Sequence, residues 1–185
     1  MDAEKRMVTR DCPATAIPYG DRVVIPAGSE VMITHRLGGH FTVTWDYGMA
    51  RITGENADAI GEASTTVSTT TATESKQPTD TPPDEQAIWE QLKMVYDPEI
   101  PVNIVDLGLV YSMAIEESQP KRYCAIVKMT LTAPGCGMGP YIAEDAKNRL
   151  LQLPNIAEAQ VDIVWDPPWN QDMISEEGKM HLGLI

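Results

Sequence analysis

The residue whose type and position point most clearly to chemistry is Cys136, in the segment Thr132-Ala133-Pro134-Gly135-Cys136-Gly137-Met138-Gly139-Pro140. A strand-like pattern precedes this segment and a helix opened by Pro140 follows it, so we expect an accessible thiol in a loop whose three glycines leave the backbone uncovered. Backbone N–H groups at a helix start favour thiolate over thiol, which predicts a lowered pKa for Cys136. A thiolate is the form that binds iron or zinc. From spacing alone, a glycine-rich turn with an incidental small residue explains the segment equally well.

A second group of polar residues occupies segment 96–110, where two prolines exclude a regular helix. Asp97, Glu99 and Asp106 place three carboxylates on this constrained loop. Rigid acidic loops can bind metals or basic partners. For Asp97 and Asp106, each taken alone, the acceptance of hydrogen bonds from backbone amides in turns is the simpler role.

Two tryptophans flank a rigid turn in the segment Trp165-Asp166-Pro167-Pro168-Trp169-Asn170. Stiff aromatic segments of this kind either close the edge of a core or present a surface to a partner. The sequence favours neither role over the other.

The elements that must position these residues form a mixed α and β pattern over residues 84–185. Helical spacing and caps predict helices over 84–96, 140–151 and 175–182, and alternation predicts strands over 110–116, 123–131 and 159–165. Tyr123, Ala125, Val127, Met129 and Leu131 share one strand face, which we expect to be core. The order α-β-β-α-β-α predicts an α+β domain built as a two-layer α/β sandwich.

A small all-β domain is predicted before it, over residues 1–61. Short apolar and β-branched runs predict strands over 22–25, 30–34, 40–45 and 49–52, with glycine-containing turns between them. Successive hairpins follow from such turns, so we expect a β meander or partial barrel.

Residues 62–83 separate the two patterns and are dominated by Thr, Ser and Pro. Such a segment cannot bury enough apolar surface to offset its ordering entropy, which predicts a flexible linker. An O-glycosylated stalk is the less favoured alternative, because residues 1–6 lack the apolar stretch of a secretory signal.

Composition limits the partners that this chain can have. Fourteen basic and 27 acidic residues give a net charge of −13, which opposes binding to nucleic acid and to anionic membrane surfaces. No apolar run approaches the roughly 18 residues of a membrane-spanning helix. The three cysteines are widely spaced, without a CxxC pair, so we expect no disulfide framework. A cytoplasmic protein that binds neither nucleic acid nor membrane is therefore expected.

Several separated motifs over roughly residues 84–185 occur in the order of a known family. They are Asp97-Pro98-Glu99-Ile100-Pro101-Val102, Val105-Asp106-Leu107-Gly108-Leu109-Val110, Thr130-Leu131-Thr132-Ala133-Pro134-Gly135-Cys136, Asp166-Pro167-Pro168-Trp169 and Met173-Ile174-Ser175-Glu176-Glu177. Together they resemble the MIP18 family, formerly known as the DUF59 domain. Arg10-Asp11-Cys12-Pro13, Ile25-Pro26-Ala27-Gly28 and Leu37-Gly38-Gly39 are similar to the leader of SufT proteins, which are MIP18-type factors with an added N-terminal domain.

The resemblance implies a non-enzymatic role in iron–sulfur protein maturation, with Cys136 as the metal ligand. The other functional positions that it implies are Asp97, Glu99, Asp106, Thr132, Gly135 and Trp169. Iron or an iron–sulfur cluster would be bound transiently, and the partners would be the iron–sulfur assembly machinery and apo client proteins. Many relatives have Cys-Pro where this chain has Cys136-Gly137, so we expect a more mobile loop.

An iron–sulfur cluster normally takes four protein ligands, and the predicted C-terminal domain offers two thiols, Cys124 and Cys136. The strand position of Cys124 favours packing over ligation. Cys12 could contribute only if the N-terminal domain folded over the site. We therefore expect Cys136 to provide one ligand, with the rest from a second subunit in a homo-oligomer, a partner protein or a small thiol.

Three other functions remain open at this stage. A thiol-dependent enzyme would need a base beside Cys136, but His181 is better placed as a surface residue at a helix end. A dinucleotide-binding loop would require a glycine three positions after Gly137, where Pro140 stands. An adaptor would hold other assembly proteins through the acidic loop and the tryptophan turn without binding metal.

Overall fold

The computed structural model describes residues 4–64 and 82–185. The chain divides into two units, residues 1–73 and residues 74–185, each with its own packing. The predicted linker over 62–83 falls mainly in residues 65–81, which lie outside the described residues.

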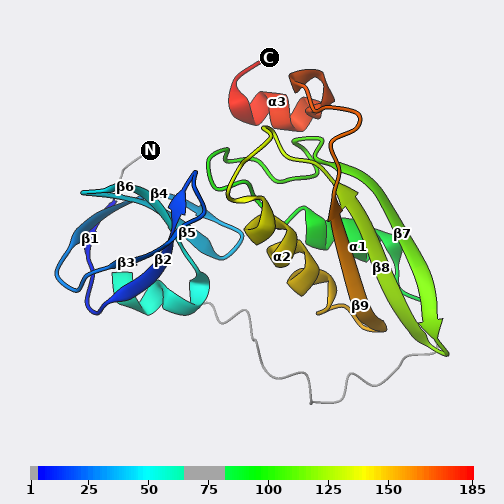
Figure 1. The fold of residues 1–185 in the computed structure, drawn as a ribbon, viewed down its shortest axis with the longest axis horizontal. Coiled ribbons are helices and arrows are strands. Elements are labelled where there is room, and N and C mark those ends of the chain that lie inside the picture. Colours follow the sequence, from blue (N-terminus) through cyan, green and yellow to red (C-terminus); the bar gives the residue numbers. More distant parts are fainter. Residues whose placement is uncertain (1–3, 65–81) are drawn as a thin grey trace. The chain divides into compact units, whose positions relative to one another are not determined.

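The first unit contains a six-stranded antiparallel sheet, drawn in blue to cyan in Figure 1. Its strands are β1 (Glu4–Met7), β2 (Cys12–Ile17), β3 (Arg22–Ile25), β4 (Glu30–Leu37), β5 (His40–Trp45) and β6 (Gly48–Ile52), and a 3₁₀ helix, Gly54–Ile60, follows. Their order in the sheet is β1-β4-β5-β6-β2-β3.

This strand order confirms two of the predicted hairpins, β4–β5 and β5–β6, but the predicted meander is wrong at β3. The four predicted strands are present as β3 to β6, but β3 and β4 are not hydrogen-bonded neighbours, so the turn at Pro26–Gly28 does not close a hairpin. Two strands, β1 and β2, were not predicted. Strand β1 pairs with β4, and strand β2 pairs with β6. The sequence signal of β2 is weak because Pro13, Ala14 and Ala16 have low strand propensity.

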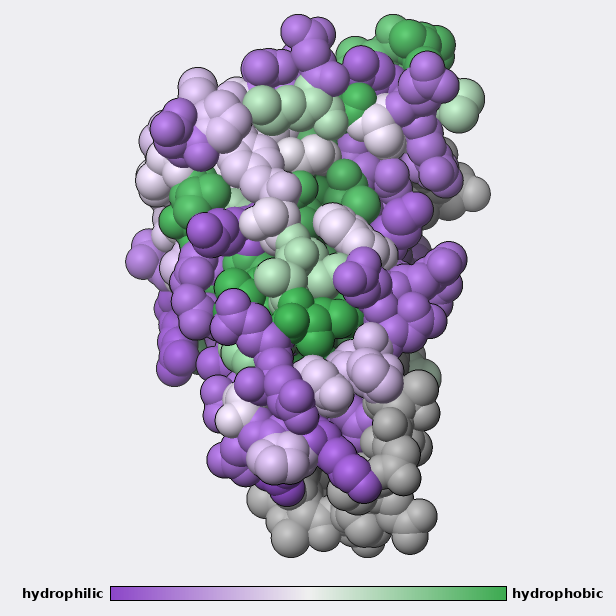
Figure 2. Space-filling model, turned by 90° about the vertical axis from the view of Figure 1, so that its right-hand side faces the viewer, coloured by the Kyte–Doolittle hydropathy of each residue, from purple (hydrophilic) through white to green (hydrophobic). Residues whose placement is uncertain are grey.

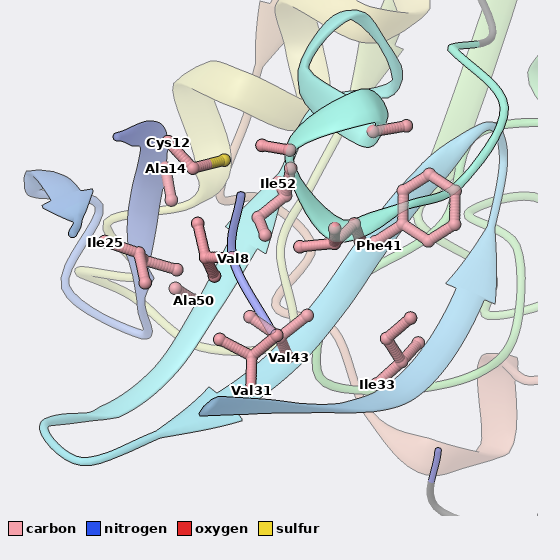
Figure 3. Packing of buried hydrophobic residues seen from close by; sticks show 13 residues of the cluster. Val8, Cys12, Ala14, Ile25, Val31, Ile33, Phe41, Val43, Ala50 and Ile52 are labelled. Carbon is pink, nitrogen blue, oxygen red and sulfur yellow. The ribbon is translucent and has the colours of Figure 1, made fainter. Parts of the chain in front are cut away.

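The core of the first unit is built from small and aliphatic side chains of all parts of the sheet. Figure 3 shows Val8, Ile25, Val31, Val43 and Ile52 turned toward one another, and each of them is at most 1% exposed. Cys12 is part of this cluster, with no exposed surface.

Within its described residues, 82–185, the second unit has three strands and three α-helices, in the chain order that the sequence predicts. The strands are β7 (Val110–Gln119), β8 (Arg122–Met129) and β9 (Ile156–Ile163), and the helices are α1 (Glu85–Leu92), α2 (Gly139–Leu150) and α3 (Glu176–Leu182). The sheet order is β7-β8-β9, and α2 packs against both β9 and α1 (Figure 1). The chain therefore has the mixed α and β content that was predicted.

The ends of the helices follow from local chemistry. Asp84 caps α1 by accepting a hydrogen bond from Gln86 N at 3.0 Å, and Ser175 caps α3 by accepting one from Gly178 N at 3.0 Å. Helix α1 ends earlier than the predicted residue 96, because the chain after it turns back and Ile104 N donates to Val95 O at 2.9 Å.

One face of the three-stranded sheet is the core face predicted for β8. Ala125, Val127 and Met129 are fully buried. Their cross-strand partners on β9, Ala159, Val161 and Ile163, continue the same apolar face.

The strand directions bring three separate segments to one edge of this sheet. Strands β8 and β9 are parallel, so segments 130–139 and 164–175 leave their carboxyl ends side by side. Strand β7 is antiparallel to β8 and begins there, with Val110 opposite Met129, so segment 97–109 arrives at the same place. We call this place the site edge; it contains every functional position that the resemblance implies.

Candidate functional site

Hydrogen bonds tie the three segments of the site edge to one another. Thr130 N donates to Leu109 O at 2.7 Å, and Val164 N donates to Met129 O at 2.8 Å. Trp169 Nε1 donates to Leu107 O at 2.7 Å, which joins the tryptophan turn to the acidic loop. The topology therefore assembles a single site from residues that are up to 72 positions apart in the sequence, Asp97 and Trp169.

Cys136 lies in the loop between β8 and α2 and is half-buried. Gly135 precedes it with a φ of +82°, and an added Cβ at Gly135 would meet no atom within 4 Å, so this part of the loop is open. Gly139 is different, because it is buried and its added Cβ would overlap the Leu131 side chain. The expectation that all three glycines leave the backbone uncovered is therefore wrong at Gly139, whose missing side chain leaves room for the Leu131 side chain against the start of α2.

The pKa of the Cys136 thiol is raised above its ordinary value, which contradicts the predicted lowering. Burial is the largest cause, and the negative charges of Asp97 and Glu99 add to it. The backbone N–H groups of Met138 and Gly139 do lower the pKa, as expected at a helix start, but they do not outweigh the other causes. The prediction failed because it considered only the helix and neither the burial of the thiol nor the acidic loop that the fold brings alongside.

Asp97 and Glu99 form the acidic side of the site. Asp97 is 3% exposed, and its Oδ1 accepts hydrogen bonds from Glu99 N at 2.8 Å and Ile100 N at 3.3 Å. Burial raises the pKa of Asp97 against these two hydrogen bonds, and burial and the charge of Asp97 raise the pKa of the exposed Glu99. Asp97 thus caps a turn, the simpler of its two predicted roles, and its charge also acts on Cys136.

Asp106 holds Ser175 and the start of α3 against the acidic loop. Its carboxylate accepts hydrogen bonds from Asn103 Nδ2 at 2.5 Å and from Ser175 Oγ at 2.9 Å, and its carbonyl oxygen accepts one from Ser175 N at 2.8 Å. An added Cβ at Gly178 would lie 2.8 Å from that carbonyl oxygen, so α3 sits directly against the loop. Asn103 and Ser175 were not singled out as functional from the sequence, although the Asn-x-x-Asp spacing and the capping serine were visible signals.

The tryptophan turn closes the edge of a core, one of its two predicted roles, through Trp169. Trp169 is half-buried and closes the core edge through its hydrogen bond to Leu107, whereas Trp165 is 47% exposed. Both tryptophans line a pocket of about 430 Å³ whose walls are Leu131, Thr132, Pro134, Gly135, Trp165, Pro168 and Trp169. We call this the tryptophan pocket, and it adjoins the cysteine loop because Gly135 is one of its walls.

The remaining thiols and the candidate base lie away from Cys136 or are inaccessible. Cys124 is half-buried on β8, opposite Glu158 of β9, and its pKa is raised by burial and by the charges of Glu158 and Glu116. Cys12 is enclosed in the core of the first unit. His181 is exposed in the last turn of α3, as expected for a helix-end surface residue.

Within residues 4–64 and 82–185, no group of three or more His, Cys, Asp or Glu side chains is arranged to hold a metal ion. In the same residues, none of the helices combines the length and the apolar character that crossing a membrane requires. Asp97 and Glu99 are close enough to Cys136 to raise the pKa of its thiol, but in the described residues they do not form a metal site with it.

Comparison with known proteins places the acidic loop and the cysteine loop in a recognised sequence family. Residues 85–163 match the family model described as "Iron-sulfur cluster assembly protein". The chain is 45% identical over 91 residues to the "Fe-S protein maturation auxiliary factor SufT" of Staphylococcus aureus, covering 49% of this chain and 99% of that protein. It is 39% identical over 101 residues to the "Fe-S protein maturation auxiliary factor" of Porphyromonas gingivalis, covering 55% and 92%. A crystal structure of a domain of unknown function, DUF59, from Bacillus anthracis is 37% identical, covers 55% of this chain and 92% of that one, and has a TM-score of 0.49.

The coverage of these matches separates the two units. A stretch of 91 residues of this chain accounts for 99% of the Staphylococcus aureus protein, so that protein has no room for a counterpart of the first unit. The expectation that SufT proteins carry an added N-terminal domain is therefore wrong for this relative. The matched family model lies wholly within the second unit. The relatives therefore bear on the unit that carries Cys136.

Proposed function

Because the chain belongs to the iron–sulfur cluster assembly protein family, MIP18 (formerly DUF59) of the SufT type, we propose that Cys136 holds iron or an iron–sulfur cluster transiently during delivery to apo client proteins. The observation that carries this proposal is the position of Cys136, a half-buried thiol in an open loop at the site edge. The backbone N–H groups of Met138 and Gly139 face its sulfur and favour the thiolate that ligation requires.

The incomplete donor set supports transient cargo rather than a resident cluster. A cluster normally takes four protein ligands, and the site edge supplies one cysteine thiol, that of Cys136. Asp97 already uses one carboxylate oxygen to cap its turn. The other ligands would come from a second subunit, a partner protein or a small thiol, and a cargo held by one protein sulfur can be released to a client by exchange of ligands.

The acidic side of the site controls the protonation of the free thiol. Burial, Asp97 and Glu99 raise the pKa of Cys136, so the thiol keeps its proton when no cargo is present. Binding of a cationic metal displaces that proton to solvent, and metal affinity therefore increases with pH. A protonated thiol is a poor nucleophile, so the same environment limits oxidation and alkylation between deliveries.

The test is anaerobic reconstitution of the full chain with iron and sulfide, followed by iron and sulfide analysis and an absorbance spectrum. Cys136→Ala is expected to lose most of the bound iron, while the matched control Cys124→Ala retains it. Circular dichroism of both variants checks that each remains folded. Equal iron content in native protein and Cys136→Ala would rule out the proposed ligand.

An adaptor role without metal is the second candidate, and the tryptophan pocket is the observation that favours it. An adaptor predicts that a folded Cys136→Ala variant still supports maturation of client enzymes in cells that lack the native protein. Loss of client maturation together with loss of iron binding would instead support delivery through Cys136.

A further inference from the structure

The tryptophan pocket has the form of a binding site for an apolar side chain. Its volume of about 430 Å³ falls within the roughly 300–1,000 Å³ of small-ligand pockets, and none of its wall residues is charged. Trp169 is held in place by its hydrogen bond to Leu107 O, so one aromatic wall is rigid. Trp165 leaves 47% of its surface in water, which is costly for so large an aromatic group unless a partner covers it.

The charges around the pocket are of one sign. Segments 97–109, 130–139 and 164–175, which converge at the site edge, carry five carboxylates and no Lys, Arg or His, and Glu176 and Glu177 follow at the start of α3. The whole of residues 82–185 carries seven basic against 16 acidic residues, so the site edge concentrates the negative charge of its unit. Asp166 is exposed beside Trp165 in the chain, and Glu99 is exposed and close enough to Cys136 to raise its pKa.

We propose that the tryptophan pocket docks an extended segment of the apo client that inserts an aromatic side chain between Trp165 and Trp169. Basic side chains beside that anchor pair with the carboxylates of the site edge, including Glu99 and Asp166. The inference rests on the proposed function and specifies the client that this function serves. Docking beside Gly135 holds the client's own ligands near Cys136, which raises their effective concentration for ligand exchange.

The experiment uses the full metal-free chain labelled with ¹⁵N and three end-blocked peptides, Gly-Lys-Trp-Lys-Gly, Gly-Glu-Trp-Glu-Gly and Gly-Lys-Ser-Lys-Gly. Titration with the first peptide is expected to shift the indole N–H signals of Trp165 and Trp169 and the amide of Gly135, and to leave those of Trp45 and Trp89 unmoved. The two other peptides are expected to bind at least tenfold more weakly, because each lacks either the basic residues or the aromatic anchor.

Two variants locate the binding. Trp165→Ser is expected to weaken binding of the first peptide at least tenfold, whereas Met180→Ala, which removes another exposed apolar side chain of the same unit, leaves it unchanged. Equal binding of the Lys-Trp-Lys and Glu-Trp-Glu peptides, or no shift at Trp165 and Trp169, would overturn the proposal. Movement of the Trp165 signal on dilution of the protein alone would also overturn it, because a second copy would then occupy the pocket.

Failure of this inference can be separated from failure of the proposed function. Cys136→Ala is expected to bind the peptide as the native chain does, and Trp165→Ser is expected to take up iron as the native chain does. Iron uptake without peptide binding would leave the metal role intact and exclude the docking site. Peptide binding without iron uptake would leave the docking site intact and exclude the metal role.

Discussion

The two units of this chain place the same residue types in opposite environments. In the first unit, carboxylates are neutralised by arginines, with Asp58 at 2.7 Å from Arg10 and Glu62 at 2.8 Å from Arg36, and the unit's cysteine is sealed in the core. At the site edge of the second unit, carboxylates accept hydrogen bonds from backbone N–H groups, an amide and a hydroxyl, and a cysteine is partly open to solvent.

The difference shows which unit has charged groups and a thiol that are available to bind a ligand. Paired charges and a buried thiol contribute to structure and leave little for a ligand to use. Within the described residues of the second unit, Asp97 and Glu99 are not paired with a basic side chain and lie near the accessible thiol of Cys136. The pKa values of all three groups are raised, which is typical of a functional site. Negative charge at the site edge is retained although it raises the pKa of Cys136, which is consistent with a site built to attract cations.

The largest effect is expected from a glycine that the site edge packs tightly. Gly108 has a φ of +70°, and an added Cβ would overlap the Met173 carbonyl, so Gly108→Ala should lower the free energy of unfolding of the second unit by about 3 kcal/mol. Gly28→Ala in the first unit is the matched control, because Gly28 has a φ of +84° with no atom within 4 Å. It should cost only the left-handed backbone term of about 1 kcal/mol.

Urea unfolding followed by the amide NMR signals of each unit measures the two glycine variants separately. Similar losses for Gly108→Ala and Gly28→Ala would show that the backbone conformation decides the cost. That result would contradict the close contact between Gly108 and Met173.

A smaller effect is expected from the carboxylate that holds α3. Asp106→Ala removes the carboxylate that accepts hydrogen bonds from Asn103 and Ser175, so both donors lose their acceptor. The free energy of unfolding should fall by about 1–3 kcal/mol. Amide hydrogen exchange over Ser175–Gly178 should become faster. The paired control is Asp58→Ala in the first unit, where an exposed ion pair with Arg10 is lost and no measurable change in stability is expected. Unchanged exchange in α3 would contradict the anchoring role of Asp106.

The smallest effect is expected on the reactivity of Cys136. Removing the charge of Glu99 in Glu99→Gln lowers the pKa of Cys136, so more thiolate is present at neutral pH and alkylation by iodoacetamide should be roughly twofold faster. In every variant the rate should increase with pH, because the raised pKa of Cys136 places its thiolate at higher pH than that of a free cysteine. Mass spectrometry of the modified peptides measures the rates.

Glu116→Gln is the control for the alkylation experiment, because Glu116 acts on the pKa of Cys124. It should leave the rate at Cys136 unchanged, and the buried Cys12 should stay unmodified in the folded chain. A slower reaction at Cys136 in Glu99→Gln would contradict the proximity of the acidic loop.

Much of the second unit could be predicted because its signals are local. Asp84 and Ser175 cap helices through their own side chains, Gly183 ends α3 in a left-handed conformation, and the alternation in β8 marks its buried face. The first unit was predicted less well, since strand pairing depends on partners that are distant in sequence. Strand β2 lies beside β6, more than 30 residues later, and no local pattern reports that pairing.

The roles of the site residues divide along the same line. Cys136 was recognisable as a candidate thiol because its glycine-rich loop between a strand and a helix is a local pattern. The sign of its pKa shift was not recognisable, because it depends on the burial of the thiol in the fold and on Asp97 and Glu99, which are about 40 residues away in sequence. For Asp106, taken alone, the sequence favoured hydrogen bonds from backbone amides in a turn, and only the position of Ser175 reveals that its carboxylate anchors α3.

The sequence by itself determined the elements of the second unit, the cysteine in its strand-to-helix loop and the excess of negative charge, because capping, periodicity and composition act over a few residues. Only the tertiary structure decided that the acidic loop, the cysteine loop and the tryptophan turn meet, because that depends on β9 running parallel to β8 and β7 running antiparallel to it. The environment of a titratable group is the sum of the charges and burial that the whole fold brings to it, and this sum is set by contacts between residues far apart in the chain.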